Sequence, residues 1–231
     1  MTIQRYHNEW RQGISRLARD QAWDKTRGYC RSVTGESLWH MVASLPFEGG
    51  TIYLGPGRYN IMDTLTLNRS NVQIIGNRDA IIDVGGDFIV LAGDDMTIEG
   101  VTFVVEDAAS PTNVDILRLT GERCQIKNCF MDQITDRGIS MQGKRSLVQG
   151  CTWTGTATDN LIHAENACVG PRILGNDMDG NRAATDIITV DGTAGSDCTY
   201  VIIDDNWVQG GIAYPNADTQ YGENQGSAHP A

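Results

Sequence analysis

The sequence predicts an all-β fold, a right-handed single-stranded parallel β-helix of about five to six coils. Three observations support this prediction. One motif of a short apolar strand, a turn residue and a second apolar strand recurs as TIEGVTF (97–103), QIKNCFM (125–131) and LVQGCTW (147–153). Apolar side chains form two columns that keep a fixed phase to each other. Successive repeats begin 22–29 residues apart, which is the length of one coil of a β-solenoid.

The first column holds the expected inward-facing anchors of one strand: Ile74, Ile98, Ile126, Val148, Ile173 and Ile202. Two places after each anchor stands a residue type that tolerates a left-handed backbone: Gly76, Gly100, Asn128, Gly150, Gly175 and Asp204. Each coil should therefore bend at the same corner. Three places further on are large apolar side chains for the interior: Phe103, Met131, Trp153, Met178 and Trp207.

The second column belongs to another strand of each coil and contains Ile89, Leu117, Ile139, Ile162 and Ile188. Four residues after each anchor comes a second set of turn residues: Gly93, Gly121, Gly143, Asn166 and Gly192. The Leu/Asn consensus of a leucine-rich repeat is absent. Parallel coils wind right-handed for the same reason that parallel crossovers do.

A short amphipathic helix is expected at the N-terminus. Its apolar side chains recur at helical spacing with arginines between them, and we expect the following residues to contact a partner: Tyr6, Trp10, Arg11, Ile14 and Leu17. An exposed apolar face of this kind must rest on another surface. The segment is therefore predicted to be an attachment arm.

A second helix is predicted within SLWHMVASL (37–45), whose apolar positions share one face: Leu38, Met41, Val42 and Leu45. Pro46 and the glycine pair that follows should end this helix. The residues 51–54 then alternate like a strand, and Gly55-Pro56-Gly57 is a turn.

The segment LWHMVASLPFEGGTIYLGPGRYNI resembles the opening segment of the pectate-lyase-like right-handed β-helix superfamily. In that superfamily a helix commonly plugs the open end, and a GGT-(V/I)-x-(L/F)-P-x-G-x-Y segment starts the first coil; here Gly55 stands where the first proline is frequent. The resemblance covers residues 37–209 and implies the fold more than an activity. The superfamily includes pectin-degrading enzymes, phage tailspikes and other virion proteins, and the virion members are usually homotrimers.

Charge divides the chain into three regions: a basic helical N-terminal arm (1–35), the β-helix with its capping helix (36–209) and a polar C-terminal tail (210–231). The arm carries seven basic and three acidic residues, whereas the rest of the chain carries eleven basic and 26 acidic residues. The arm should seek an acidic partner or its own acidic body. Nucleic acid is excluded as a ligand of the body because phosphates would be repelled. The composition of the tail is typical of a disordered segment.

The six cysteines show neither a CxxC pair nor zinc spacing. Most stand where the repeat needs an apolar side chain, so we expect reduced, buried thiols, with a disulfide between stacked cysteines as the alternative. No cofactor or metal is expected. The first ten residues lack the apolar core of a secretory signal, and the longest apolar run, FIVLA (88–92), is too short to span a bilayer.

Candidate catalytic residues lie near the second column. Asp136 and Asp159 occupy the same place on adjacent coils, three residues before an anchor, and Asp186 lies two before its own. Carboxylates on adjacent coils come within the range that glycosidases use. His163 should point outward with Arg118 on the same face, although a single outward histidine is ordinarily a surface residue. The polygalacturonase Asn-Thr-Asp, Gly-His-Gly and Arg-Ile-Lys segments and the pectate-lyase Arg-x-Pro-x-x-Arg run are absent.

These features favour a structural virion protein of a bacteriophage, for capsid decoration (cement) or as a spike, made in the host cytoplasm. It would form a homotrimer and bind other virion proteins through residues 1–35 and 210–231, with no membrane partner. One alternative is a polysaccharide lyase or hydrolase (a depolymerase) that uses the carboxylates above with His163. Another is a non-catalytic module that binds a surface polysaccharide. Outward aromatic residues would favour the module, but Trp153 and Trp207 are expected in the interior.

Overall fold

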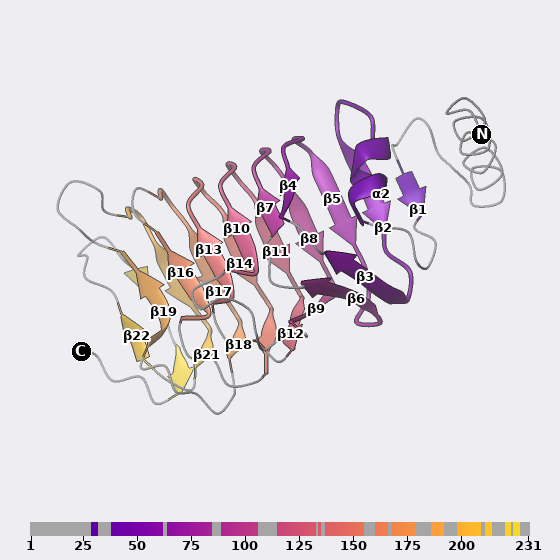
Figure 1. The fold of residues 1–231 in the computed structure, drawn as a ribbon. Coiled ribbons are helices and arrows are strands. Elements are labelled where there is room, and N and C mark those ends of the chain that lie inside the picture. Colours follow the sequence, from indigo (N-terminus) through magenta and orange to yellow (C-terminus); the bar gives the residue numbers. More distant parts are fainter. Residues whose placement is uncertain are drawn as a thin grey trace, which may run out of the picture.

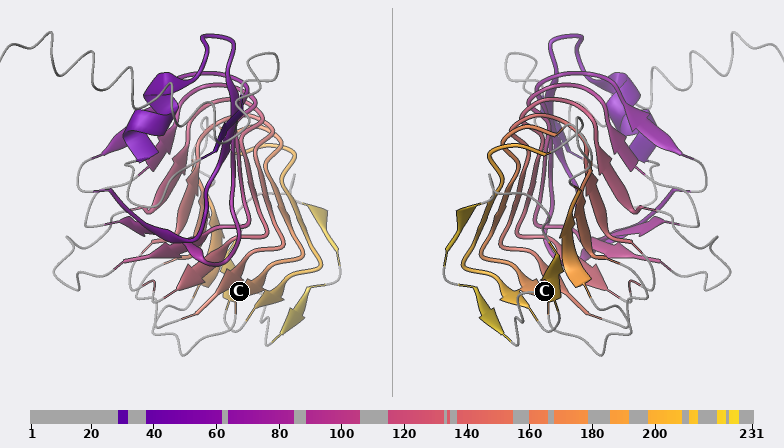
Figure 2. Two further views of the ribbon diagram at one scale, coloured as in Figure 1. Left: turned by 90° about the vertical axis from the view of Figure 1, so that its right-hand side faces the viewer. Right: turned by 90° about the vertical axis from the view of Figure 1, so that its left-hand side faces the viewer.

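The computed structural model describes the following residues: 29–31, 38–61, 64–84, 89–105, 115–132, 134, 137–154, 160–165, 168–178, 186–191, 198–208, 211–213, 220–222 and 224–226. Their strands stack along one axis (Figure 1). Viewed along that axis, three sheets form the sides of a roughly triangular solenoid (Figure 2). The predicted attachment residues Tyr6, Trp10, Arg11, Ile14 and Leu17 lie outside the described residues.

Sheet A contains, in order, β1 (Tyr29–Arg31), β2 (Gly50–Tyr53), β5 (Val72–Ile75), β8 (Thr97–Glu99), β11 (Gln125–Lys127), β14 (Leu147–Gln149), β17 (Arg172–Leu174), β20 (Ile202–Asp204) and β23 (Gln220–Tyr221). Sheet B contains β3 (Gly57–Ile61), β6 (Ala80–Val84), β9 (Thr102–Val104), β12 (Phe130–Asp132), β15 (Thr152–Trp153), β18 (Asp177–Met178), β21 (Trp207–Val208) and β24 (Gln225–Gly226). Sheet C contains β4 (Leu65–Leu67), β7 (Ile89–Leu91), β10 (Leu117–Leu119), β13 (Ile139–Met141), β16 (Ile162–Ala164), β19 (Asp186–Val190) and β22 (Gly211–Ala213).

Each strand pairs in parallel with the equivalent strand of the next coil, as between β10 and β13 or β11 and β14. This arrangement confirms the predicted right-handed parallel β-helix. Both predicted columns face the interior, since anchors such as Ile126, Val148, Leu117 and Ile162 are fully buried. Each side chain of this kind that leaves water stabilises the fold by roughly 1.5–3 kcal/mol.

The last coil is shifted by one residue from the prediction. Ile203 pairs with Ile173 and is buried, and Val208 pairs with Met178. The sequence alignment placed Ile202 and Trp207 inside, which is wrong for this coil, and Trp207 is 49% exposed on the outer face of sheet B. Trp153 is buried as predicted.

The corner between sheets A and B has a left-handed backbone, as predicted, at Gly100, Asn128, Gly150 and Gly175, with φ values from 52° to 73°. In the last coil this conformation belongs to Asp205 rather than Asp204, in keeping with the one-residue shift. Gly76 has no positive φ, so the first predicted corner position is wrong.

The capping helix is α2 (Leu38–Ser44), and the four side chains predicted for its buried face are all buried: Leu38, Met41, Val42 and Leu45. α2 lies at one end of the solenoid (Figure 2). No helix among the described residues is long and apolar enough to cross a membrane.

The composition of the segment 210–231 suggested disorder, but parts of this segment form strands that continue the solenoid. β22 pairs with β19, β23 with β20 and β24 with β21. Strand pairing satisfies backbone polar groups of β22, β23 and β24, so these three strands do not depend on apolar side chains alone.

The cysteines only partly follow the prediction. Cys124, Cys129 and Cys151 are free and buried, as expected. Burial raises the pKa of the Cys124 thiol to about 11. Cys168 and Cys198 instead form a disulfide, because the fold stacks them on adjacent coils with a Cα–Cα distance of 4.7 Å.

Candidate functional site

Polar side chains gather on the outer face of sheet C. The strands place Arg118, Ser140, His163 and Thr189 in one register row across β10, β13, β16 and β19. Their neighbours in each strand point inward and form the second apolar column. Strand alternation therefore fixes which side chains share this face.

A second row begins where these strands end and contains Gln142, Glu165 and Asp191. Each residue donates its backbone N–H to the preceding coil, at 2.9 Å to Leu119, 3.0 Å to Met141 and 2.8 Å to Ala164, respectively. Successive coils stack roughly 4.8 Å apart. The main chains of Glu165 and Asp191 are thus neighbours, although 25 residues separate them in the sequence.

His163 and Asp191 form the most defined pair of this face. Nε2 of His163 lies 2.9 Å from Oδ1 of Asp191, and their side chains are 12% and 29% exposed. Nδ1 of His163 has no hydrogen-bond partner among the described residues. When Nε2–H donates to Asp191, Nδ1 is the unprotonated nitrogen, and it is buried away from solvent.

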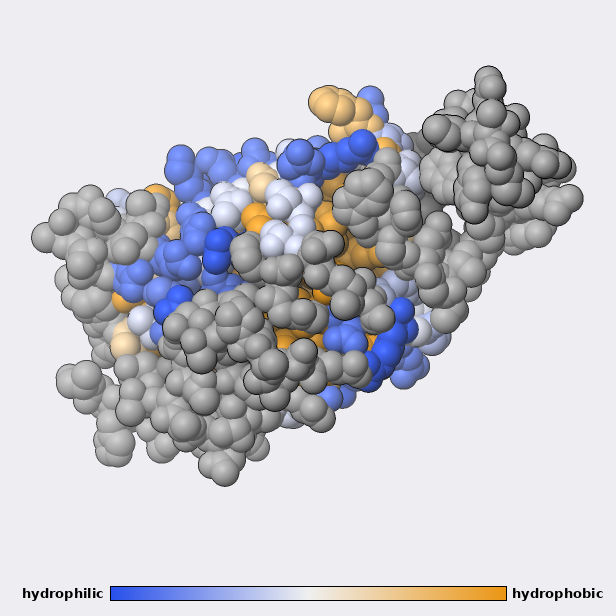
Figure 3. Space-filling model, viewed as in Figure 1, coloured by the Kyte–Doolittle hydropathy of each residue, from blue (hydrophilic) through white to orange (hydrophobic). Residues whose placement is uncertain are grey.

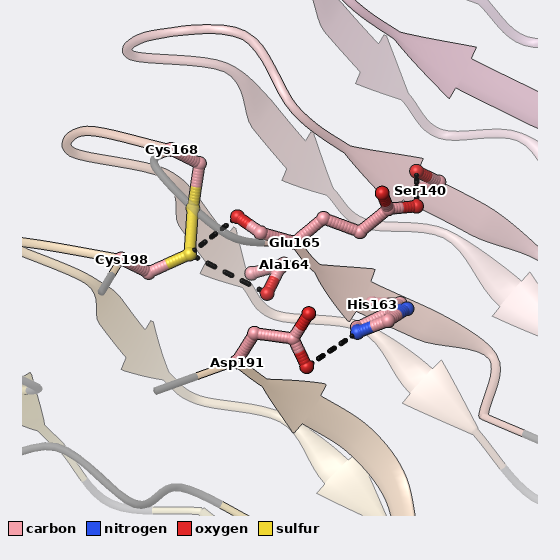
Figure 4. Close-up of a disulfide and its surroundings, with 7 residues drawn as sticks. All are labelled: Ser140, His163, Ala164, Glu165, Cys168, Asp191 and Cys198. Carbon is pink, nitrogen blue, oxygen red and sulfur yellow. Dashed lines mark hydrogen bonds and ion pairs between the residues drawn. A yellow bond between two sulfur atoms is a disulfide. The ribbon is translucent and has the colours of Figure 1, made fainter. Parts of the chain in front are cut away.

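Glu165 is held from the other side by two donors. The Ser140 hydroxyl donates to Oε1 of Glu165, and Nε2 of Gln142 donates to Oε2 at 2.8 Å. Ser140 is fully buried. The two contacts keep the Glu165 carboxylate in one orientation, turned toward Ser140 (Figure 4).

An ion pair lies at the other end of the face. Arg118 donates from Nη2 to Oδ2 of Asp115 at 2.9 Å. Asp115 is only 2% exposed, and burial raises the pKa of its carboxyl while the Arg118 hydrogen bond opposes that rise. Oδ1 of Asp115 has no partner among the described residues.

The predicted site residues have different outcomes. His163 points outward with Arg118 on the same face, as expected, but it is paired with Asp191 instead of standing alone. Asp136 and Asp159 lie outside the described residues. The backbone of Asp186 belongs to β19, opposite Gly211, and its role stays a prediction.

Sequence reasoning missed Ser140, Gln142, Glu165 and Asp191. They stand one or three places after the second-column anchors, whereas the candidate carboxylates Asp136, Asp159 and Asp186 stand two or three places before them. The outward position of each sheet C strand and the position directly after that strand were therefore the signal that could have identified them.

In Figure 3, hydrophilic residues line the upper edge of the solenoid, and residues of intermediate and hydrophobic character lie below them. Within the described ranges, no group of three or more His, Cys, Asp or Glu side chains could hold a metal ion. The face thus offers carboxylates and an imidazole, the groups used for proton transfer.

Comparison with known proteins identifies the fold. No family model and no curated protein matches the sequence. Among solved structures, the catalytic domain of a GH87 α-1,3-glucanase aligns with a TM-score of 0.61 at 13% identity, over 88% of this chain and 40% of that domain. A pectin methylesterase from Aspergillus niger has a TM-score of 0.61 at 11% identity, over 87% and 85% of the two chains.

Pectin methylesterase PemA from Erwinia chrysanthemi aligns with a TM-score of 0.54 at 12% identity, over 88% of this chain and 90% of its own. All of these are right-handed parallel β-helix proteins that process glycans. At such low identity the likeness establishes the shared pectate-lyase-like fold, and function must be argued from the site.

Proposed function

We propose that this protein binds a polysaccharide along the outer face of sheet C and hydrolyses it there. The observation that carries the proposal is the placement of Glu165, His163 and Asp191 on one face of adjacent coils, with Glu165 and Asp191 each held by a hydrogen bond. Two carboxylates that flank a glycosidic bond are the usual machinery for glycoside hydrolysis.

The two carboxylates would take different roles. Glu165 accepts hydrogen bonds from Ser140 and Gln142, so it is suited to face the sugar carbon where positive charge develops. Asp191 in its protonated form, oriented by Nε2 of His163, would deliver the proton to the leaving oxygen. Water then supplies a hydroxyl to the sugar carbon and a proton to regenerate the protonated Asp191, so the hydrolysis is balanced.

The charge of the body favours a neutral or weakly charged glycan. Residues 36–231 carry eleven basic and 26 acidic side chains, a balance that repels a polyanion at low ionic strength. The similar structures include an α-1,3-glucanase and pectin methylesterases, so α-1,3-glucan and methylated pectin are reasonable first substrates.

A polysaccharide panel tests this function. The full chain is incubated with neutral and anionic glycans, and reducing ends and unsaturated products are measured. We expect new reducing ends, and a loss of at least about 100-fold in rate for Glu165→Gln and Asp191→Asn. Asp177→Asn, an exposed carboxylate on sheet B, is the matched control and should keep full activity.

Several outcomes would contradict hydrolysis at this face. Hydrolysis would be contradicted if no glycan of the panel gave a product, or if both carboxylate variants kept full activity. Binding without cleavage would support the glycan-binding module instead. Unsaturated products would indicate a lyase.

We also propose that the protein is carried on a bacteriophage virion as a homotrimer. The observation in favour is the sequence charge asymmetry, with a net charge of +4 over residues 1–35 and −15 over the remainder. A basic arm on an acidic body suits attachment to an acidic partner. This role is compatible with glycan hydrolysis, since particles meet surface polysaccharides.

Co-expression with capsid and tail proteins encoded beside it tests the virion role. We expect the chain to sediment with assembled particles and to lose this association when residues 1–35 are removed. Sedimentation equilibrium of the free protein should give a trimer. A monomer that never sediments with a particle would reject the proposal.

A further inference from the structure

The disulfide lies next to the main chains of both residues that carry the proposed catalytic carboxylates. Cys168 follows Glu165 by three residues, and Cys198 follows Asp191 by seven. Figure 4 shows the two sulfur atoms beside the main chain of Glu165, with Asp191 and His163 on the neighbouring strands. Both cysteines are fully buried.

Earlier coils turn the corner after sheet C in a different way. There a glycine directly follows the second-row position: Ala92-Gly93, Thr120-Gly121 and Gln142-Gly143. The main chains approach so closely that a Cβ on Gly143 would lie 1.9 Å from the Gly121 carbonyl oxygen. This corner is therefore short and tightly packed.

The two cysteines take the place of that glycine in the later coils. Lys144, Val169 and Thr199 accept equivalent hydrogen bonds from the coil before, at 2.8, 2.7 and 2.7 Å. The residues that precede them, Gly143, Cys168 and Cys198, consequently occupy one corner position. Residues 166–167 and 192–197 are thus insertions relative to the earlier coils.

Each insertion lies between an acidic residue and a cysteine whose backbone N–H donates to the main-chain carbonyl of that acidic residue. The Cys168 N–H donates to the Glu165 carbonyl at 3.2 Å, and the Cys198 N–H donates to the Asp191 carbonyl at 3.3 Å. Sγ of Cys198 also lies 2.8 Å from the Glu165 carbonyl oxygen. Since a disulfide sulfur carries no proton, this is a packing contact. The Sγ–Sγ bond then joins the cysteines that follow the two insertions.

We propose that the Cys168–Cys198 disulfide positions the Glu165 and Asp191 carboxylates for catalysis, so that a dithiol reductant lowers the activity without unfolding the solenoid. This inference rests on the proposed hydrolysis. In the reduction, the Sγ–Sγ bond breaks and each sulfur gains one electron and one proton, while the dithiol closes to a cyclic disulfide. The cysteines are positioning residues and do not touch the substrate.

Hydrogen exchange tests, without any substrate, whether the disulfide holds Glu165 and Asp191 in place. The full chain is reduced with dithiothreitol, and mass spectrometry confirms two new thiols. We expect the amides of Glu165 and Asp191, which donate to Met141 and Ala164, to exchange at least about tenfold faster. Amides of β8 and β11, on earlier coils, should not change. Unchanged exchange at Glu165 and Asp191, or a uniform rise along the solenoid, would overturn the proposal.

Activity supplies the second readout. On the glycan that the oxidised protein cleaves, kcat should fall about tenfold on reduction, with KM within about twofold, because misplaced catalytic groups affect the reaction more than binding. The double variant Cys168→Ala/Cys198→Ala should have the kcat and KM of the reduced protein, and dithiothreitol should not change them. Cys124→Ala, a free buried thiol on an earlier coil, is the matched control and should behave as wild type.

The two proposals fail in different ways. If the oxidised protein cleaves no glycan, the proposed hydrolysis fails, while the exchange experiment still decides whether the disulfide holds the two carboxylates. If cleavage is found and reduction leaves kcat unchanged, the hydrolysis stands and the positioning role is rejected.

Discussion

Nε2 of His163 lies 2.9 Å from Oδ1 of Asp191, a residue 28 places later in the sequence and one coil further along the solenoid. Neither strand could place the pair alone. The parallel register of β16 and β19 sets His163 beside Thr189, and Asp191 follows two residues later. The most specific polar contact of the candidate site is therefore a product of coil stacking.

This pair should be energetically coupled. A double-mutant cycle with His163→Ala and Asp191→Ala, measured by urea unfolding at pH 7, should give a coupling free energy of roughly 1 kcal/mol. Because both side chains are largely shielded from solvent, 0.5 M NaCl should change it little. The exposed pair Asp95–Arg123 is the comparison, and its coupling should fall in salt. Zero coupling for His163 and Asp191 would contradict the geometry.

The stability contribution of Asp115 should depend on pH. Burial raises the pKa of its carboxyl above the ordinary value of 3.8. Its contribution to stability is therefore fully present below pH 3.8 and is lost as pH rises through the folded-state pKa. Asp115→Asn cannot ionise. Its free energy of unfolding should therefore improve relative to wild type between pH 4 and pH 7. If the difference in the free energy of unfolding between variant and wild type is constant with pH, or changes in the opposite direction, the pKa of the buried Asp115 carboxyl is not raised.

A ladder of asparagine side chains should be a major source of stability in the last coils. The amide of Asn206 accepts from the backbone and side chain of Asn176, at 3.0 and 2.9 Å, and donates to the Ile173 carbonyl at 2.9 Å. Asn206→Ala would leave buried groups unpaired and should cost roughly 2–4 kcal/mol in urea unfolding. Asn77→Ala, at an exposed position, should stay within about 0.5 kcal/mol.

Two glycines should respond differently to the same substitution. A Cβ on Gly143 would lie 1.9 Å from a carbonyl oxygen, whereas one on Gly175 meets no atom within 4 Å. Gly143→Ala should destabilise by roughly 3 kcal/mol through overpacking. Gly175→Ala should cost only about 1 kcal/mol, for its left-handed φ of 59°. Equal thermal or urea stability of the two variants would contradict the close corner packing.

The sequence was most informative where the repeat is regular. Inward anchors such as Ile126 and Ile139, and corner residues such as Asn128, were identified because each coil repeats the same local requirements of burial and backbone conformation. The capping helix was found by the same local logic. The alignment failed at Ile202 and Trp207, because a six-residue insertion at 192–197 left the phase of the last coil undetermined.

The sequence by itself determined a β-helix with a capped end, because alternation and turn residues act within a few positions of the chain. Only the tertiary structure decided which side chains meet. Stacking brought Glu165, His163 and Asp191 onto one face, and it joined Cys168 to Cys198, which the sequence suggested were reduced. Such contacts join adjacent coils of unequal length. They depend on the strand register between those coils, which the sequence of one coil does not determine.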